Sequence, residues 1–569
     1  MNIVGINFSD FHESSVCLLQ DGKIVFACAE ERLSRLKQDK AFPRLAIQAA
    51  LDFAGLKSTD VDHVAFTFPN PWRARLHDLK LFATRQFPLD LDRLEMWTAQ
   101  ALKGHRHKGG ELDYRRAFGA PRGGFHFPNH HLCHALSAWC LSGFDEAAVL
   151  VIDGRGSHEA TTLWKARGNA IDLLETIEFP DSIGVFYAGI TGYLGFEPLA
   201  DEWKVMGLAA YGEPGIDMSP LIRYNQESYH VVGRQFLRTS DGRRGVEDVL
   251  GPKRHAAAEL EQRHMDVARA AQDACEQAML AMLRRVTRLT GSRKLCLAGG
   301  VALNCKANGE LLRSGLIDDI YVQPASGDDG ACIGAALAVY ASLNRTVPRN
   351  ANGNVYLGHE FTNDQVEKVL ETYKLPYLRL LSPPKAAAEL LARDRLVGWF
   401  QGRMEFGPRA LGNRSILSNP RFRANTDRVN EAVKFREKWR PFAPSVAYEK
   451  AQLYFDDFYN SPYMILSFWA NKTRASQIPA VVHVDGSCRV QSVKREANAR
   501  YYDLLTEFEK LADVPVVMNT SFNLKGDPIV CTPKDAIQTF YASGLDDLVI
   551  GDFLLSKQSP ADLSALLAR

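Results

Sequence analysis

The chain has 569 residues, too many for one hydrophobic core, so we expect at least two domains. Apolar residues make up 46% and charged residues 24% of the chain, as in ordinary globular proteins. Lys and Arg total 68 and Asp and Glu total 67, and this balance argues against a dedicated nucleic-acid-binding protein.

The chain starts with a strand-like segment that lacks the pattern of a signal peptide, and no uncharged apolar stretch approaches the roughly 18 residues of a membrane span. The 10 cysteines form no CxxC pair, which excludes the usual spacing of a structural zinc site and indicates reduced, mostly buried thiols. We therefore expect a soluble cytoplasmic protein without a membrane partner.

Two similar patterns of strands and turns occur about 140 residues apart. In the first, residues 3–9, 15–20 and 23–29 predict three strands, and Asp21-Gly22 predicts a tight hairpin turn. The second places an acidic turn and a hairpin within residues 147–179. An internal duplication of this kind is the organisation of the actin-like (ASKHA) ATPase fold.

The segment between these patterns contains two histidines at helical spacing. A helix that begins at Asn129 would place His130 and His134 one turn apart on the same face, where two imidazoles can chelate a divalent metal. For an arbitrary pair at this spacing, a structural role in the core or at a helix cap is the more frequent outcome. A metallopeptidase is disfavoured, because histidine stands at position 131, where the catalytic glutamate of that motif would be.

Further along, residues 204–212 carry small side chains suited to close helix packing, and residues 256–289 predict a long amphipathic helix with a break. A strand then leads into Gly299-Gly300 and a helix start at Asn304, a geometry in which backbone N–H groups can meet a nucleotide. Asp328 precedes another predicted helix, and an N-cap is the default role for aspartate there.

The C-terminal part, which begins after a boundary within residues 343–362, is marked by clustered cations. Three arginines surround the Gly407-Pro408 turn, a costly arrangement unless something anionic is held there. Further candidates beside glycines, prolines and aromatic residues are Lys434, Arg440, Arg489 and the 519–523 turn with Ser521. We favour a phosphate or acyl-phosphate pocket over a solvated basic face.

The order of the motifs DFHESS, HHLCHA, VIDGRG, KVMGLAAYG, AGGVALN, GPRALG, KWRPFAPS and NTSFN resembles the O-carbamoyltransferase family of antibiotic and nodulation-factor biosynthesis, with the aminoglycoside-tailoring enzymes most similar. The resemblance implies an α/β protein with a duplicated ASKHA domain over residues 1–350 and a YrdC-like α/β domain over residues 360–569. It also implies that the second domain makes carbamoyl adenylate from carbamoyl phosphate and ATP. The first domain then transfers the carbamoyl group to a hydroxyl of a small molecule.

The resemblance also assigns site residues. It implies a divalent metal, Fe(II) first with Mn(II) or Zn(II) as alternatives, on His130, His134, Asp153 and Asp328. His12 would be the general base or orienting residue beside the acceptor hydroxyl. Nucleotide contacts would include Lys37 with Gly299, Gly300 and Asn304. The contacts to carbamoyl phosphate and ATP would be Arg409, Lys434, Arg440, Arg489 and Ser521.

Two features depart from the family or match it least. Arg155 places a cation beside the expected metal site, and residues 70–125 and 213–255, which should shape the acceptor pocket, match least. The expected partners are therefore ATP, carbamoyl phosphate and an acceptor alcohol, with a homodimer as a candidate assembly and no nucleic acid. The alternatives are a tRNA threonylcarbamoyl-adenosine synthase, a hydrogenase-maturation carbamoyltransferase, which would need CxxC zinc fingers, and a non-enzymatic actin-like ATPase.

Overall fold

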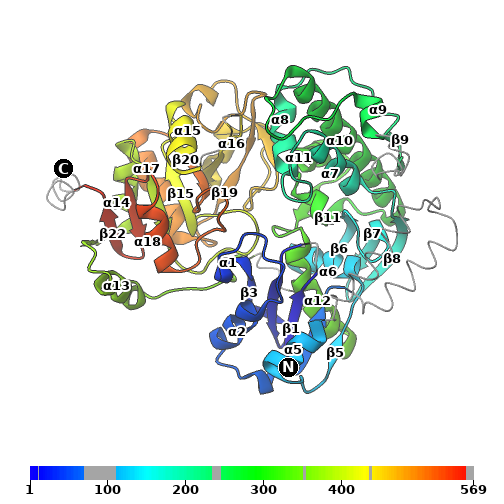
Figure 1. Ribbon diagram of the computed structural model, residues 1–569, viewed down its shortest axis with the longest axis horizontal. Coiled ribbons are helices and arrows are strands. Elements are labelled where there is room, and N and C mark those ends of the chain that lie inside the picture. Colours follow the sequence, from blue (N-terminus) through cyan, green and yellow to red (C-terminus); the bar gives the residue numbers. More distant parts are fainter. Residues whose placement is uncertain are drawn as a thin grey trace. The chain divides into compact units, whose positions relative to one another are not determined.

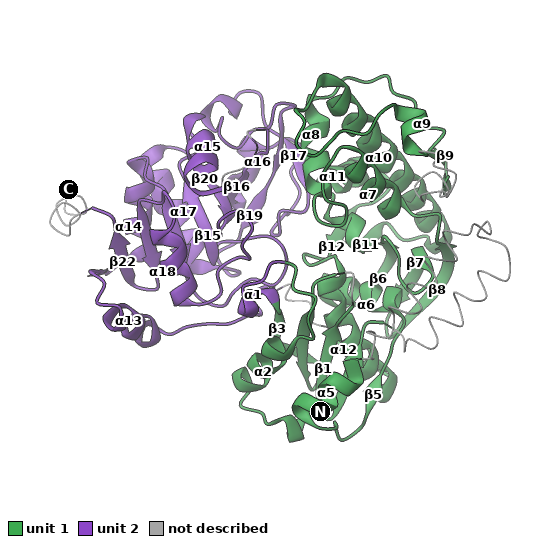
Figure 2. Ribbon diagram, in the orientation of Figure 1, with its two compact units in different colours: residues 1–30, 38–353 green, residues 31–37, 354–569 purple. Residues whose placement is uncertain are grey.

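The structure is a computed structural model that describes residues 1–9, 12–68, 110–232, 245–349, 354–434, 437 and 439–558. Much of the 70–125 segment, expected to shape the acceptor pocket, lies outside these residues. The chain divides into two compact units (Figure 2). Unit 1 comprises residues 1–30 and 38–353, and unit 2 comprises residues 31–37 and 354–569.

The first sheet of unit 1 has the strand order β3-β2-β1-β4-β5 (Figure 1). Its antiparallel strands are β1 (Asn2–Asn7), β2 (Ser15–Gln20) and β3 (Lys23–Ala29), and β4 (His63–Phe66) and β5 (Phe125–His126) add to β1 in parallel. Asp21 and Gly22 have φ values of 47° and 80°, the left-handed conformations that a type I′ turn needs. The predicted hairpin is confirmed.

The second sheet of unit 1 repeats this topology, with the order β12-β11-β6-β7-β8. Its antiparallel strands are β6 (Glu146–Ile152), β7 (Glu159–Arg167) and β8 (Ala170–Glu178), and β11 (Lys294–Ala298) and β12 (Asp319–Val322) add in parallel. Each half is therefore a three-stranded meander extended by two parallel strands. This confirms the predicted duplication and the actin-like organisation.

Two helices, α6 (His130–Ser142) and α12 (Asp328–Asn344), lie between the two sheets (Figure 1). Helix α12 contacts β1 and β2, α6 contacts β6 and β11, and the two helices contact each other. Both are consequently buried on nearly all sides. The other α-helices and strands among the described residues of unit 1 are α2 (Arg44–Phe53), α5 (Gly110–Phe118), α7 (Ile183–Tyr193), α8 (Glu202–Leu208), β9 (Ile222–Tyr224), β10 (Tyr229–Val231), α9 (Val246–Leu250), α10 (Gln262–Thr290) and α11 (Cys305–Arg313).

The long helix differs from its prediction. Helix α10 is one continuous element of 29 residues that starts at Gln262, so the expected break is wrong. The small residues at the end of the 204–212 segment do serve close packing, because a Cβ at Gly212 would lie 2.2 Å from the carbonyl oxygen of Met265 in α10.

Unit 2 is an α/β domain built on a mixed sheet of eight strands with the order β13-β22-β21-β14-β15-β20-β16-β19. Its strands are β13 (Leu378–Arg379), β14 (Val397–Phe400), β15 (Arg414–Ser418), β16 (Ala443–Ala447), β19 (Gln491–Val493), β20 (Val516–Ser521), β21 (Asp547–Ile550) and β22 (Phe553–Ser556), with a separate ribbon of β17 (Ser467–Trp469) and β18 (Ser487–Arg489). Its helices are α1 (Glu31–Ser34), α13 (Asn363–Thr372), α14 (Pro383–Ala392), α15 (Ala424–Val429), α16 (Ala451–Tyr454), α17 (Ala499–Ala512) and α18 (Pro533–Tyr541). Side chains of α14 and α17 form one hydrophobic core with Trp399, Leu417 and Val517 of the sheet.

All ten cysteines are buried and none is in a disulfide, as predicted. Within the part of the chain that the structure describes, no helix is both long and apolar enough to cross a membrane.

The contact between α6 and α12 can be tested at Gly334. A Cβ at this position would lie 1.7 Å from the carbonyl oxygen of Cys133, so Gly334→Ala must push the two helices apart. We expect the free energy of unfolding, measured by urea denaturation, to fall by about 1–3 kcal/mol. Ser342→Ala, at an exposed position of the same helix, should change it by less than about 0.5 kcal/mol. Equal stability of Gly334→Ala and the wild type would contradict this packing.

Candidate functional site

Helix α6 holds the two histidines, and its start is set by a cap. The Asn129 side chain accepts a hydrogen bond of 2.9 Å from the backbone N–H of Leu132, so Asn129 is the N-cap and the helix begins at His130, one residue after the predicted start. His130 and His134 are both fully buried, and their Nε2 atoms are 3.1 Å apart. One helical turn thus places the two nitrogens side by side.

Two aspartates from different elements meet these nitrogens. Asp153 follows the last residue of β6, and its Oδ2 is 3.5 Å from His130 Nε2. Asp328 Oδ1 lies 3.4 Å from His130 Nε2 and 3.5 Å from His134 Nε2. One ligand atom from each of the four side chains lies within 4.8 Å of every other. Asp328 is the first residue of α12, after Gly327 at the cap, so its default assignment as an N-cap is wrong.

The neighbouring groups orient these ligands. A carbonyl oxygen can only accept, so His130 donates its Nδ1–H to that of Thr67 across 3.2 Å, which orients Nε2 towards the cluster. The backbone N–H of Gly300 donates to Asp153 Oδ1 at 3.0 Å. Gly299 has φ 92°, and a Cβ there would lie 2.2 Å from the carbonyl oxygen of Ile152. The double-glycine turn therefore reaches Asp153 only because it lacks side chains.

The spacing and charge of the cluster suit one divalent cation. Ligands about 2.1 Å from an ion are about 3.0–3.4 Å apart in octahedral or tetrahedral sites, close to the distances above. Burial alone would lower the pKa of His130, but the Asp328 and Asp153 carboxylates outweigh it and raise that pKa to about 10. Burial opposes ionisation of Asp328, yet His12 and His130 hold its pKa well below the ordinary value. The carboxylates thus favour positive charge at their centre.

His12 belongs to the electrostatic surroundings of this cluster. The carboxylate of Asp328 raises the pKa of His12 above its ordinary value, against the effect of burial, and Asp153 adds to the shift. The backbone N–H of His12 is fixed by the Ser9 hydroxyl at 3.3 Å. The His12 imidazole therefore lies within the electric field of the proposed metal ligands.

Asn304, Lys37 and Arg155 lie outside the four-residue cluster. The Asn304 side chain caps α11 by accepting from Ala307 N–H at 3.0 Å, and its amide also pairs with Gln272 of α10. Lys37 is exposed and ends the 31–37 segment of unit 2. The guanidinium of Arg155 lies 5.0 Å from the centre of the Phe179 ring. A nucleotide contact by Lys37 or Asn304 stays a prediction.

In unit 2, Lys434 is the buried cation of the predicted anion pocket, at the end of a π-helical segment, Asn430–Lys434. Its Nζ donates to the carbonyl oxygen of Ser521 at 2.6 Å, to that of Asn523 at 3.0 Å and to Asn523 Oδ1 at 2.9 Å. The hydroxyl of Ser521 is 3.2 Å from the same nitrogen. The structure therefore brings Lys434 and Ser521 together at the end of β20.

Hydrogen bonds anchor the Arg409 loop to the same strand. Asn519 of β20 donates to the carbonyl oxygen of Ala410 at 3.5 Å, and Gln491 of β19 donates to that of Leu411 at 2.8 Å. Arg489 lies two residues before Gln491, whereas Arg440 lies 3.5 Å from Glu437. The Arg409 loop is thus tied to β20, which carries Ser521, and to β19, which follows Arg489.

Two of the three arginines around the Gly-Pro turn, Arg403 and Arg414, bind backbone carbonyl oxygens. Arg414 is fully buried, donates to the carbonyl oxygens of Gln401 and His359, and lies 3.7 Å from the centre of the Phe400 ring. Arg403 donates to the carbonyl oxygen of Leu357 at 2.6 Å. Backbone carbonyls, which carry no sequence signal, solvate both guanidinium groups.

The predictions also missed Glu405. Its Oε1 accepts from the backbone N–H groups of Leu411, Asn413 and Arg414 at 2.6, 3.2 and 3.2 Å, and so holds the turn that follows Arg409. The sequence signal that could have revealed this role of Glu405 is an acidic residue within an arginine-rich turn.

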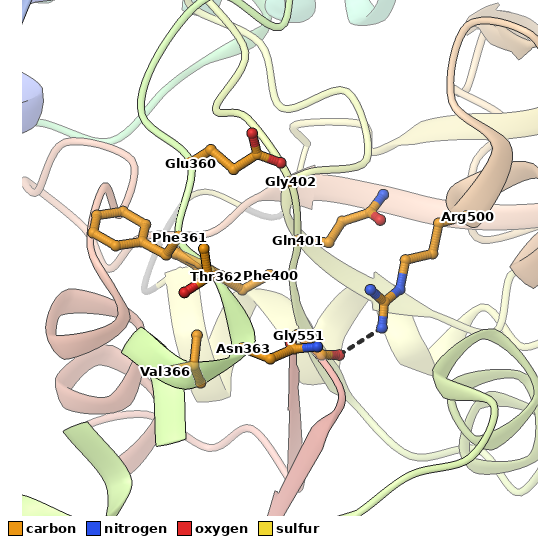
Figure 3. A pocket seen from close by; sticks show the side chains of 10 residues that line it. All are labelled: Glu360, Phe361, Thr362, Asn363, Val366, Phe400, Gln401, Gly402, Arg500 and Gly551. Atoms are coloured by element: carbon orange, nitrogen blue, oxygen red, sulfur yellow. Dashed lines mark hydrogen bonds between the residues drawn. The ribbon is translucent and has the colours of Figure 1, made fainter. Parts of the chain in front are cut away.

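A pocket of about 270 Å³ in unit 2 was not predicted (Figure 3). It lies at the carboxyl ends of the parallel strands β14 and β21, where ligand sites are frequent in α/β sheets. Phe361 and Gln401 are among its lining residues, and Arg500 donates to the carbonyl oxygen of Gly551 at 2.8 Å. None of the predicted site residues lines it.

Comparison with known proteins gives matches over most of the chain. A family described as "Carbamoyltransferase N-terminus" matches residues 2–78 and 99–337, and one described as "Carbamoyltransferase C-terminus" matches residues 388–557.

Individual relatives match over similar lengths. Nodulation protein NolNO of Sinorhizobium fredii is 38% identical over 98% of this chain and 81% of its own length. Nodulation protein NolO of Bradyrhizobium diazoefficiens is 41% identical over 77% of this chain and 81% of its own length. The uncharacterized protein sll1178 of Synechocystis is 39% identical over 98% of this chain and 97% of its own length.

The four-residue cluster leads to a prediction about metal content. We expect the purified chain to carry about one divalent ion, and His134→Ala to lower the affinity at least about 100-fold, because one nitrogen ligand is lost. Elemental analysis after equilibration with a metal buffer measures this. His230→Ala, an exposed histidine paired with Asp181, is the control. Wild-type metal content in His134→Ala would contradict the assignment.

Proposed function

Because the chain belongs to the carbamoyltransferase family, we propose that this enzyme is an ATP-dependent O-carbamoyltransferase that acts on a hydroxyl of a small molecule. The supporting observation is the separation of two kinds of chemistry. Unit 1 carries a buried ligand set for a cation, and unit 2 carries the buried cation Lys434 beside the hydroxyl of Ser521.

The first step is activation of the carbamoyl group, which we assign to unit 2. Water cleaves carbamoyl phosphate to carbamate and inorganic phosphate, and a carbamate oxygen then attacks the α-phosphorus of ATP. The products are carbamoyl adenylate and pyrophosphate. Arg409, Lys434, Arg440 and Arg489 neutralise the phosphate oxygens, and the hydroxyl of Ser521 adds a donor, so charge that develops in the transition state meets fixed cations.

The second step is transfer, which we assign to unit 1. The acceptor hydroxyl attacks the carbamoyl carbon and AMP leaves, so that the carbamate ester forms as the phosphate–carbonyl bond breaks. His12 takes the hydroxyl proton or orients the hydroxyl. A divalent ion held by His130, His134, Asp153 and Asp328 would neutralise the adenylate phosphate and so improve AMP as a leaving group. Gly299, Gly300, Asn304 and Lys37 are the assigned nucleotide contacts.

Two substitutions separate the steps. We expect Arg409→Ala to lower the rate of pyrophosphate release from carbamoyl phosphate and ATP by about 100-fold or more, because a donor to the developing charge is lost. His12→Ala should release pyrophosphate at the wild-type rate and accumulate carbamoyl adenylate, without carbamoylated product. Mass spectrometry of the nucleotides, with a panel of sugar and natural-product alcohols as acceptors, measures both.

The matched control is Arg495→Ala, an exposed arginine paired with Asp503. Failure of the wild type to form the adenylate with metal present would refute the proposed function. Loss of the same step in both test variants would refute the division of labour between the units.

A further inference from the structure

Residues 31–37 belong to unit 2 although the chain on both sides of them belongs to unit 1. Glu31 and Arg32 are buried within unit 2, and the short helix α1 (Glu31–Ser34) starts the segment. An excursion of seven residues adds little to a core of this size, so its contacts must explain its position.

The arginines of this segment bind the backbone of two loops. Arg35 donates from Nη2 to the carbonyl oxygen of Pro528 at 2.8 Å and from Nη1 to that of Ile529 at 2.7 Å. This two-pronged contact uses the planar fork that only arginine has. Arg32, also buried, donates to the carbonyl oxygen of Gly407 at 3.1 Å.

Two further observations show that the segment is held firmly. Leu33 packs against a small hydrophobic cluster of Met404, Ile529 and Cys531, so it contacts both loops at once. Arg35 has φ 62°, a left-handed conformation that is unfavourable for a non-glycine residue. The surrounding contacts maintain that conformation.

Each loop leads directly to a residue of the proposed activation site. Gly407 stands two positions before Arg409. On the other side, Val530 donates its backbone N–H to the carbonyl oxygen of Phe522 at 2.9 Å, next to Ser521. Asn523, which accepts from Lys434, also donates to the carbonyl oxygen of Asp527 at 2.8 Å.

We propose that residues 31–37 form a strap that positions the Arg409 loop and the 521–530 loop for carbamoyl phosphate, with Arg35 as the main positioning residue. The inference rests on the proposed function of unit 2. It gives a stretch of the N-terminal sequence a role in the chemistry of the C-terminal domain. Lys37, at the end of the strap, would follow any change in its position.

The test compares Arg35→Ala with the wild type in the full chain. We expect the KM for carbamoyl phosphate in pyrophosphate release to rise by about 10-fold to 100-fold, since small misplacements of binding groups are costly. The KM for the acceptor and the bound metal should be unchanged. Arg35→Lys, which keeps the charge without the fork, should give an intermediate KM. Arg421→Ala is the control, because Arg421 donates to the carbonyl oxygen of Ala512, which precedes the opposite end of β20.

Hydrogen exchange tests whether the strap holds the two loops without relying on enzyme activity. Arg35→Ala should speed exchange in residues 404–412 and 521–530 and leave unit 1 unchanged, even if the wild type proves inactive on carbamoyl phosphate. If Arg35→Ala does not fold, hydrogen exchange and the KM for carbamoyl phosphate are compared between Arg35→Lys and the wild type. Unchanged exchange and KM in a folded Arg35 variant, or an equal KM effect of Arg421→Ala, would overturn the proposal.

Discussion

The arrangement of unit 1 depends on how the charges of two buried carboxylates, Asp153 and Asp328, are balanced. Asp153 and Asp328 offer oxygens within 4.8 Å of each other, and at an effective dielectric constant of about 20 two such charges repel by roughly 3–4 kcal/mol. Both belong to the second half of the duplicated fold, Asp153 after β6 and Asp328 after β12, at the start of α12. The close packing of α6 on α12 at Gly334 sets the distance between the histidines and Asp328. A cation at their centre turns a repulsive pair into a stable ligand set.

Unit 2 meets the opposite difficulty, because it concentrates positive charge. Oxygen atoms, most of them from the backbone, accept hydrogen bonds from its buried cations. Lys434 is held by carbonyl and side-chain oxygens, Arg414 by carbonyls and an aromatic ring, and Arg35 by two successive carbonyls. Neutral oxygens orient a cation without cancelling its charge, so an anionic substrate still meets a positive field. The two units therefore suit a reaction in which an anion is activated in one and transferred in the other.

Local patterns predicted much of this architecture. The hairpin at Asp21-Gly22, the repeated meander and the helix that starts at His130 follow from alternation, turn chemistry and capping, which are properties of short segments. The motif resemblance then named the four ligands that the fold brings together. Contacts between distant segments could not be predicted in this way. The partners of Arg414 and Arg403 are backbone carbonyls, which no side-chain pattern reveals, and the role of Asp328 depends on residues nearly 200 positions away.

The most direct test of the shared cation is its effect on stability. The free energy of unfolding of chelator-treated protein would be measured by urea denaturation, without oxygen, as Fe(II), Mn(II) or Zn(II) is added back. The account predicts that at least one ion raises this free energy by about 2.7 kcal/mol at 100 times its Kd, and that Asp328→Asn loses most of the gain. No gain with any of the three ions, or an equal gain in Asp328→Asn, would contradict it.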